Sequence, residues 1–190
     1  MQNDYFENEV KVLEVNSEDV CTKLEKMGAQ KVFDGDRVFT TFDSMADSFL
    51  AKDTLIRLTE EEKLKLSVST NTSKSSTGEK QTIKVFVSRK KEMIDFFKAI
   101  GIEPIAEVKS HRTSYELTTS LGIVDFDVDT FPLIGSFLEI DLENMEKPLS
   151  EYLKDLGLEN HKVVNCGTEQ IYAMYGYDYY KEFSIKGPSI

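Results

Sequence analysis

Charged and apolar residues alternate along several short segments of this chain, and this pattern constrains its fold more than any other feature. Side chains of a β-strand point to opposite faces in turn, so alternation separates two kinds of residue onto two faces. In residues 5–13, for example, Glu7, Glu9 and Lys11 share one face while apolar residues occupy the other. The pattern predicts half-buried antiparallel strands, each with one apolar and one charged face.

The later strands repeat this alternation, but the sign of the charge changes along the chain. Basic rows lie in the middle and comprise Arg57, Lys63, Lys65 and Lys84. Acidic rows follow and comprise Asp125, Asp127, Asp129, Glu139 and Asp141. Solvated strand faces explain each row taken alone. If the rows face one cavity, the carboxylates would repel one another unless they held a cation. Clustered Asp and Glu suit a hard divalent cation, whereas zinc would want His or Cys.

Helix and turn signals divide the rest of the chain. Helices are predicted at 17–27, 88–100 and 148–157, because apolar residues recur there at helical spacing and a glycine follows or closes each segment. Ser17 is the predicted N-cap of the first helix. Further strands are predicted near 36–43, 54–59, 63–69, 81–87, 105–117, 122–129 and 136–142. Residues 70–80 read as a Ser/Thr-rich loop, and 168–190 as a C-terminal helix and tail.

Length and charge restrict the class of protein. The 190 residues suit a single domain, 1–190, with its core in residues 5–175. A net charge of −11 disfavours binding to nucleic acid polymers. No apolar run is long enough to span a membrane and no signal region is visible, so we expect a cytoplasmic protein that does not bind membranes. Two reduced cysteines are expected, and a homodimer is compatible with the sequence.

Several of these segments resemble one family. Glu7-Asn8-Glu9-Val10-Lys11 is similar to the E-x-E-x-K signature of CYTH proteins, also called triphosphate tunnel metalloenzymes. The segment 55–58 (LIRL) resembles the family's L-R-x-R strand, with Thr59 in place of the second arginine. The segment 111–115 (HRTSY) resembles R-x-x-Y/W, and 129–141 resembles D-x-V-x-x-L-G-x-F-x-E-I-E. The family includes class IV adenylate cyclases, thiamine triphosphatases and inorganic triphosphatases.

The resemblance implies an α+β fold, in which an antiparallel β-barrel or tunnel has helices packed outside. It implies that carboxylates bind Mg2+ or Mn2+, namely Glu7, Glu9, Asp129, Glu139 and Asp141. It also implies that basic residues bind substrate phosphates, namely Lys11, Arg57, Lys65, Lys84, Lys109 and Arg112. Of these, Lys11, Arg57, Lys65 and Arg112 would take part in catalysis. Lys109 lies one residue away from the family's lysine position.

The implied function is that of a divalent-metal-dependent phosphohydrolase acting on inorganic triphosphate, thiamine triphosphate or a nucleoside triphosphate. A class IV adenylate cyclase, which converts ATP to cyclic AMP and pyrophosphate, is the alternative. One departure motivates a third hypothesis, a non-catalytic binder of triphosphate or polyphosphate. Where the family often has R-x-E-x-E, this chain has Lys80, Thr82 and Lys84, so two acids are missing. A structural β-domain with solvated charged faces is the remaining alternative.

Overall fold

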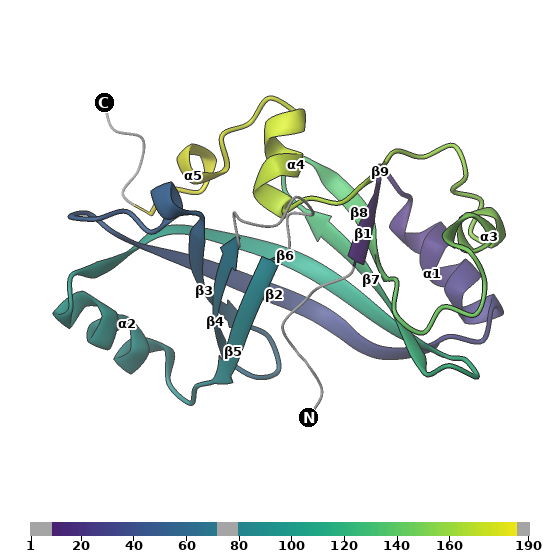
Figure 1. Ribbon diagram of the computed structural model, residues 1–190, viewed down its shortest axis with the longest axis horizontal. Coiled ribbons are helices and arrows are strands. Elements are labelled where there is room, and N and C mark those ends of the chain that lie inside the picture. Colours follow the sequence, from purple (N-terminus) through teal and green to yellow (C-terminus); the bar gives the residue numbers. More distant parts are fainter. Residues whose placement is uncertain (1–8, 72–79, 186–190) are drawn as a thin grey trace. The chain divides into compact units, whose positions relative to one another are not determined.

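The computed structural model describes residues 9–71 and 80–185, and these fold as two compact units (Figure 1). The first unit contains residues 37–71, 80–109 and 177–185, and the second contains residues 9–36 and 110–176. Two long strands, β2 (Gln30–Ser44) and β6 (Ile102–Thr118), contribute residues to both units. Glu7, a predicted metal ligand, lies outside the described residues.

The described residues form an antiparallel sheet, as the alternating sequence predicted. Nine strands are hydrogen-bonded in the order β5-β4-β3-β2-β6-β7-β8-β1-β9, and each pairing with a described register is antiparallel. The other strands are β1 (Glu9–Leu13), β3 (Thr54–Glu60), β4 (Lys65–Asn71), β5 (Lys80–Phe86), β7 (Ile123–Phe131), β8 (Gly135–Asp141) and β9 (Val163–Val164). Together with the helices, the sheet confirms the α+β class.

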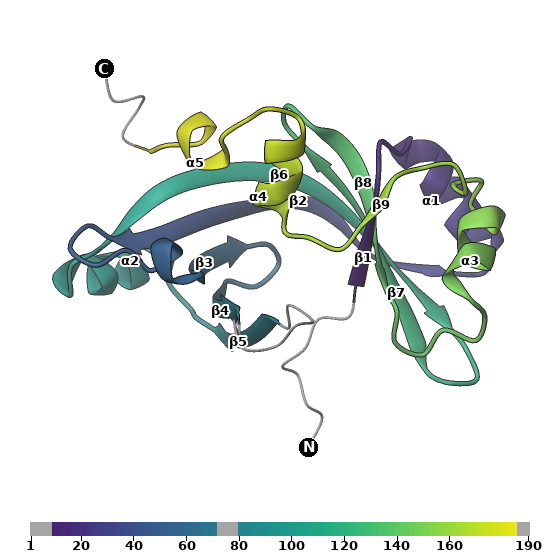
Figure 2. The same cartoon turned by 45° about the horizontal axis from the view of Figure 1, so that its top comes forward.

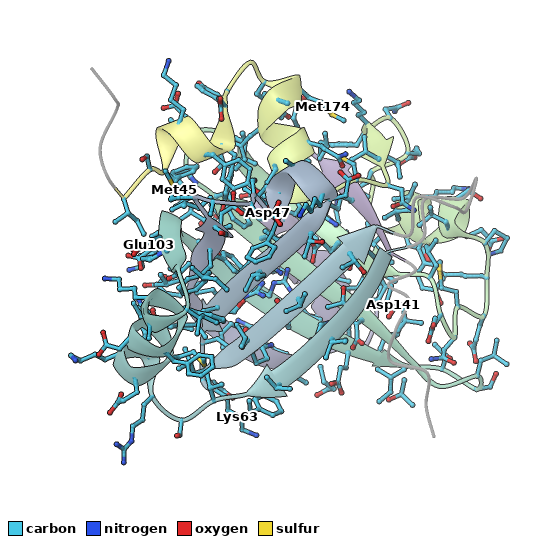
Figure 3. The ribbon with its side chains drawn as sticks, turned by 60° about the vertical axis from the view of Figure 1, so that its left-hand side comes forward. Met45, Asp47, Lys63, Glu103, Asp141 and Met174 are labelled. Atoms are coloured by element: carbon cyan, nitrogen blue, oxygen red, sulfur yellow. The ribbon has the colours of Figure 1, made fainter. Side chains whose placement is uncertain are left out.

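In the first unit, helix α2 (Lys90–Ala99) packs on one face of the sheet. Phe42, Ile56 and Leu58 point to this face and form a buried cluster with Phe97 of the helix. The centroids of the Phe42 and Phe97 rings lie 4.8 Å apart. Figure 3 shows the β3–β4 turn, marked by Lys63, and the β2–β3 connection, marked by Met45 and Asp47, at opposite ends of these strands. That connection includes the short helix η1 (Leu50–Lys52).

In the second unit, α1 (Ser17–Lys26) and α3 (Leu149–Asp155) lie side by side in both ribbon views (Figures 1 and 2). Both helices pack on the apolar face of the sheet. The buried cluster there includes Val20 and Leu24 of α1, Tyr152 of α3, and Phe126 and Leu138 of the strands. This arrangement confirms that apolar strand residues face helices, and it leaves the charged residues on the opposite face.

The helix boundaries follow the predicted signals with one correction. Asn16, not Ser17, is the N-cap of α1, because its side-chain oxygen accepts from the backbone N–H of Asp19 at 2.9 Å. Gly28 and Gly157 follow their helices with positive φ of 90° and 65°, a conformation that glycine adopts without a steric penalty. No described helix is both long and apolar enough to cross a bilayer.

The C-terminal segment forms two short helices, α4 (Thr168–Met174) and α5 (Tyr179–Glu182), in agreement with the predicted helix and tail. In the second unit, the hydroxyl of Tyr172 in α4 donates to the carbonyl of Pro132 at 2.7 Å. In the first unit, the residues after α5 bond to β6 through an antiparallel bridge between Ala106 and Ser184. Each helix is therefore attached to the sheet of its own unit.

Candidate functional site

A charged sheet face lies opposite the helices in the second unit. The register places Lys11 across from Glu139, Glu139 across from Asp127, and Arg112 across from Asp129. Because residues opposite one another share a face, strands β1, β8, β7 and β6 bring these side chains into one group. The carboxylates of this face outnumber its cations and comprise Glu9, Glu116, Asp125, Asp127, Asp129, Glu139 and Asp141. We call this surface the acidic face.

Arg112 is the centre of the acidic face. Its Nε donates to Oδ1 of Asp129 at 2.7 Å, and a terminal nitrogen donates to Oε2 of Glu139 at 2.6 Å. Its terminal nitrogens also bond the second oxygen of Asp129 and a carboxylate oxygen of Asp127. Burial lowers the pKa of Arg112, but the charges of Glu139, Asp129 and Asp127 outweigh that effect and raise the pKa well above its ordinary value. Arg112 therefore remains charged.

Lys11 is the second cation of the acidic face, and it is only 5% exposed. Its Nζ lies 2.6 Å from Oε1 of Glu9 and 3.2 Å from Oε1 of Glu139. Burial opposes its charge, but the two carboxylates reverse this effect and raise the pKa of Lys11. Glu139 therefore bridges both cations, with one oxygen toward Lys11 and the other toward Arg112.

The remaining carboxylates of this face lie close to one another. Burial raises the pKa of Asp125, and repulsion from Asp127, Glu116 and Asp141 raises it further. Asp141 also accepts from the backbone N–H of Glu143 at 2.8 Å, which orders the chain after β8.

The acidic face has the donor chemistry of a divalent-cation site, since carboxylate oxygens are the ligands that Mg2+ and Mn2+ prefer. The carboxylates of Glu9, Asp129 and Glu139 nevertheless bond Lys11 or Arg112. No described group of three or more His, Cys, Asp or Glu side chains has the arrangement of a metal site. The residues therefore fit a metal by their chemistry, and binding it would require the carboxylates to exchange partners.

The first unit has a polar face of the opposite sign. The register of β2 to β5 aligns Thr41, Arg57, Ser67 and Lys84 on the face away from α2. We call this surface the basic face; its described cations are Arg37, Arg57, Lys65 and Lys84. It also carries buried hydroxyl groups, namely those of Thr41, Thr59, Ser67, Ser69 and Thr82. A buried sheet face made of hydroxyls and cations is suited to an anionic ligand rather than to an apolar core.

The hydroxyls of the basic face include a residue that departs from the family pattern. Thr82 is 4% exposed, and its hydroxyl lies 3.0 Å from that of Ser69 on the neighbouring strand. Lys84 is exposed, two residues further along β5. The structure therefore places a neutral hydroxyl pair and a cation in the strand where CYTH proteins often have acids.

Arg37, which sequence reasoning did not single out, belongs to the basic face. It is 7% exposed, and its Nε lies 3.1 Å from Oε2 of Glu61. Glu61 also forms an ion pair with Lys65. The available signal was that Arg37 lies two residues before Phe39 and four before Thr41, which puts it on their face of β2. Asp127 lies in the same acidic row as Asp129, but the family resemblance does not assign it as a metal ligand.

Lys109 lies apart from the other predicted phosphate-binding residues. By strand alternation it shares a face of β6 with Glu107, whose carboxylate bonds the hydroxyl of Thr40 and the amine of Lys90 in α2. That is the helix-covered face of the first unit, opposite the face that carries Arg57 and Lys84. The position of Lys109 therefore gives no geometric support to a role in phosphate binding, and that role stays a prediction.

No protein-family profile matches this chain, and no curated protein sequence matches it. Solved structures do match. PH1012 from Pyrococcus horikoshii OT3 is 22% identical with a TM-score of 0.61, over 81% of this chain and 93% of that one. A candidate adenylate cyclase from Vibrio parahaemolyticus is 14% identical with a TM-score of 0.66, over 89% and 98%. HpAC1 from Hippeastrum, a candidate adenylyl cyclase with a dominant triphosphatase activity, is 11% identical with a TM-score of 0.60, over 90% and 95%.

These similarities define the class of the chain by its fold: it is an antiparallel α+β protein built like these cyclase and triphosphatase structures. The fold is the CYTH-like fold that the sequence resemblance predicted. At identities below 25%, the matches establish the fold and leave the reaction to be argued from the residues of the two faces.

Proposed function

We propose that this protein is a divalent-metal-dependent phosphohydrolase that acts on a triphosphate substrate. The observation that supports the proposal best is the acidic face. Each of its carboxylates at Glu9, Asp127, Asp129 and Glu139 forms an ion pair with Lys11 or Arg112. A sheet face with no function would gain little from such a group, because the desolvation of buried ions costs free energy that pairing only partly offsets. The group is therefore explained better by a function than by stability.

The proposed cation ligands are Glu9, Asp129, Glu139 and Asp141, with Glu7 from the N-terminal segment and Asp127 as an addition from the structure. A bound Mg2+ or Mn2+ would supply charge neutralisation for nonbridging phosphate oxygens. The donor set consists only of carboxylates, which favours these hard cations over zinc.

The cations of both faces are proposed to bind phosphate oxygens. Lys11 and Arg112 keep their charge at neutral pH, since neighbouring carboxylates raise their pKa. Arg57, Lys65 and Lys84 offer further donors on the basic face, and Arg57 has the planar guanidinium that suits two phosphate oxygens at once. A carboxylate of the acidic face would orient the attacking water. Lys11, Arg57, Lys65 and Arg112 are therefore the proposed catalytic set.

A class IV adenylate cyclase is the second candidate, because three of the matching structures, HpAC1 among them, are candidate adenylate cyclases. In that reaction a ribose 3′-hydroxyl, rather than water, attacks the α-phosphorus of ATP, and pyrophosphate leaves. The dominant triphosphatase activity of HpAC1 favours hydrolysis as the first choice. A binder without turnover is the third candidate, and the positions of Thr82 and Lys84 support it.

One experiment separates the three candidates. The purified protein is incubated with Mn2+ or Mg2+ and with either tripolyphosphate or ATP, and the products are resolved by ion-exchange chromatography. We expect phosphate release that requires the metal. Cyclic AMP as the main product from ATP would instead support the cyclase, and binding without any product would support the binder.

A matched pair of variants tests the role of the acidic face in this assay. Glu139→Gln removes the charge that bridges Lys11 and Arg112, and we expect activity to fall at least about 100-fold, as when a group that stabilises transition-state charge is lost. Glu143→Gln removes an exposed acid just after β8 and should leave the activity unchanged. Equal activity of the two variants would contradict the proposed site.

A further inference from the structure

Phe39 lies between two arginines on the basic face. The guanidinium carbon of Arg37 is 4.7 Å from the centre of the Phe39 ring, and that of Arg57 is 4.8 Å from the same centre. Phe39 is paired with Thr59, and Thr41 is paired with Arg57. Arg37 lies two residues before Phe39 on β2, and Arg57 lies opposite Thr41, two residues after Phe39. The Phe39 ring therefore lies between the two guanidinium groups.

The Arg57 side chain stacks on the Phe39 ring. The Nε of Arg57 is buried and has no hydrogen-bond partner among the described residues. An unsatisfied buried donor is unfavourable for folding, so its presence calls for an explanation. A ligand oxygen that accepts from this group would provide one. Arg37 also forms an ion pair with Glu61, whose Oε2 lies 3.1 Å from its Nε.

The Phe39 ring is itself fixed, since it is only 4% exposed. Arginine stacks on aromatic faces through cation–π attraction, which is stronger when the pair is desolvated. A guanidinium held in this way has lost its rotamer freedom before a ligand arrives, so less entropy is lost on binding. Repulsion between two arginines is also reduced when a ring keeps them apart.

These contacts do not depend on a metal. The basic face has its own cations, and a guanidinium needs no bridging ion to bind a phosphate. The acidic face, by contrast, needs a divalent cation before it can attract an anion, because its carboxylates outnumber Lys11 and Arg112. Removal of the metal should therefore abolish anion binding by the acidic face and leave anion binding by the basic face intact.

We propose that Phe39 is a positioning residue, which holds the guanidinium groups of Arg37 and Arg57 so that they bind a triphosphate without divalent metal. The identity of the ligand as a triphosphate rests on the proposed function. The ring does not touch the reacting atoms. Its effect on the ligand passes through the two arginines. Two observations carry this inference: the Nε of Arg57 has no hydrogen-bond partner in the part of the chain that the structure describes, and both guanidinium groups contact the ring.

The test measures binding of inorganic tripolyphosphate by calorimetry in the presence of EDTA. Phe39→Leu removes the ring and keeps an apolar side chain and the net charge. Phe39→Tyr keeps the ring and serves as the conservative rescue. Phe42→Leu is the matched control, because Phe42 lies on the same strand but points to the opposite face and packs on Phe97. Circular dichroism and thermal melting check folding, and Phe39→Met replaces Phe39→Leu if that variant is unfolded.

We expect wild type to bind tripolyphosphate in EDTA, and Phe39→Leu to raise the Kd about tenfold, within the range of a desolvated cation–π contact. Phe39→Tyr and Phe42→Leu should bind like wild type. Unchanged binding by Phe39→Leu, or equal weakening in Phe39→Leu and Phe42→Leu, would overturn the positioning role. Absence of wild-type binding in EDTA would overturn the metal-free site, whereas the proposed function would still be decided by metal-dependent phosphate release.

Discussion

Arg112 and Asp129 face each other across β6 and β7 and form a two-point ion pair, in which Nε of Arg112 donates to Oδ1 of Asp129 at 2.7 Å. Asp129 is only 1% exposed. A carboxylate at this depth stays charged only with a fixed counter-charge, because burial without a partner would drive it to bind a proton. The pair therefore links the stability of the second unit to the residues proposed for function.

The first prediction concerns the loss of this counter-charge. Arg112→Ala leaves Asp127, Asp129 and Glu139 without their shared cation, and we expect the free energy of unfolding to fall by about 3–5 kcal/mol. Arg112→Lys keeps the charge but cannot bond both oxygens of Asp129, so its loss should be intermediate. Urea unfolding measures both. Arg89→Ala is the control, because Arg89 is exposed and its pair with Glu92 is at the surface; a similar loss there would contradict the argument.

The second prediction separates two exposed lysines of the first unit. Lys84 shares the basic face with Arg57, whereas Lys109 shares the opposite face with Glu107. We expect Lys84→Ala to raise the KM for tripolyphosphate about tenfold or more, since a hydrogen bond to a charged group is worth about 1.5–3 kcal/mol.

Lys109→Ala, with the same change in net charge, should leave the KM near the wild-type value. Steady-state kinetics with Mn2+ tests the pair. A larger effect at Lys109 than at Lys84 would contradict the argument from strand geometry and support the phosphate contact that the family resemblance implied for Lys109.

Strand alternation made much of this fold predictable. The alternation of charged with apolar residues gave the antiparallel strands and their two faces, and Gly28, Gly101 and Gly157 marked the helix ends. The turn after β7 was also visible, because Leu133-Ile134-Gly135 separates two alternating segments. Leu133 and Gly135 both adopt positive φ, of 69° and 73°, and this turn sets the register that places Asp127 across from Glu139.

The ion pairs of the site could not be predicted in the same way. The family resemblance implied metal ligands at Asp129 and Glu139 and a phosphate contact at Arg112, but it did not show that these residues bond one another. That contact depends on the register of three strands and on side-chain rotamers, which no local pattern encodes. Arg37 was missed for a related reason, because its closeness to Phe39 and Glu61 matters only once β2 and β3 are paired.

The third prediction concerns a buried hydroxyl on the helix-covered face of the second unit. Tyr115 is 0% exposed, and its hydroxyl donates to Oε1 of Glu25 in α1 at 3.0 Å. Tyr115→Phe removes this bond and keeps the ring, so we expect a loss of about 1 kcal/mol in urea unfolding. Tyr175→Phe is the control, because Tyr175 bonds Glu14 at an exposed position. An equal loss from both variants would argue against a special contribution from the buried bond.

The fourth prediction uses pH to test repulsion on the acidic face. Burial and the charges of Asp127, Glu116 and Asp141 raise the pKa of Asp125 above its ordinary value of 3.8, so its ionised form destabilises the folded state at neutral pH. Asp125→Asn should therefore be more stable than wild type at pH 7, by less than about 1 kcal/mol because the side chain is partly exposed and solvent screens the repulsion. This advantage should shrink as the pH falls through the raised pKa and vanish below 3.8.

Asp95→Asn should show the opposite sign, because a hydrogen bond from Lys91 lowers the pKa of Asp95, and that contribution is present at neutral pH and lost on acidification. Thermal melts between pH 3 and pH 7 measure both variants, and a pH-independent difference for Asp125→Asn would rule out electrostatic repulsion as its cause.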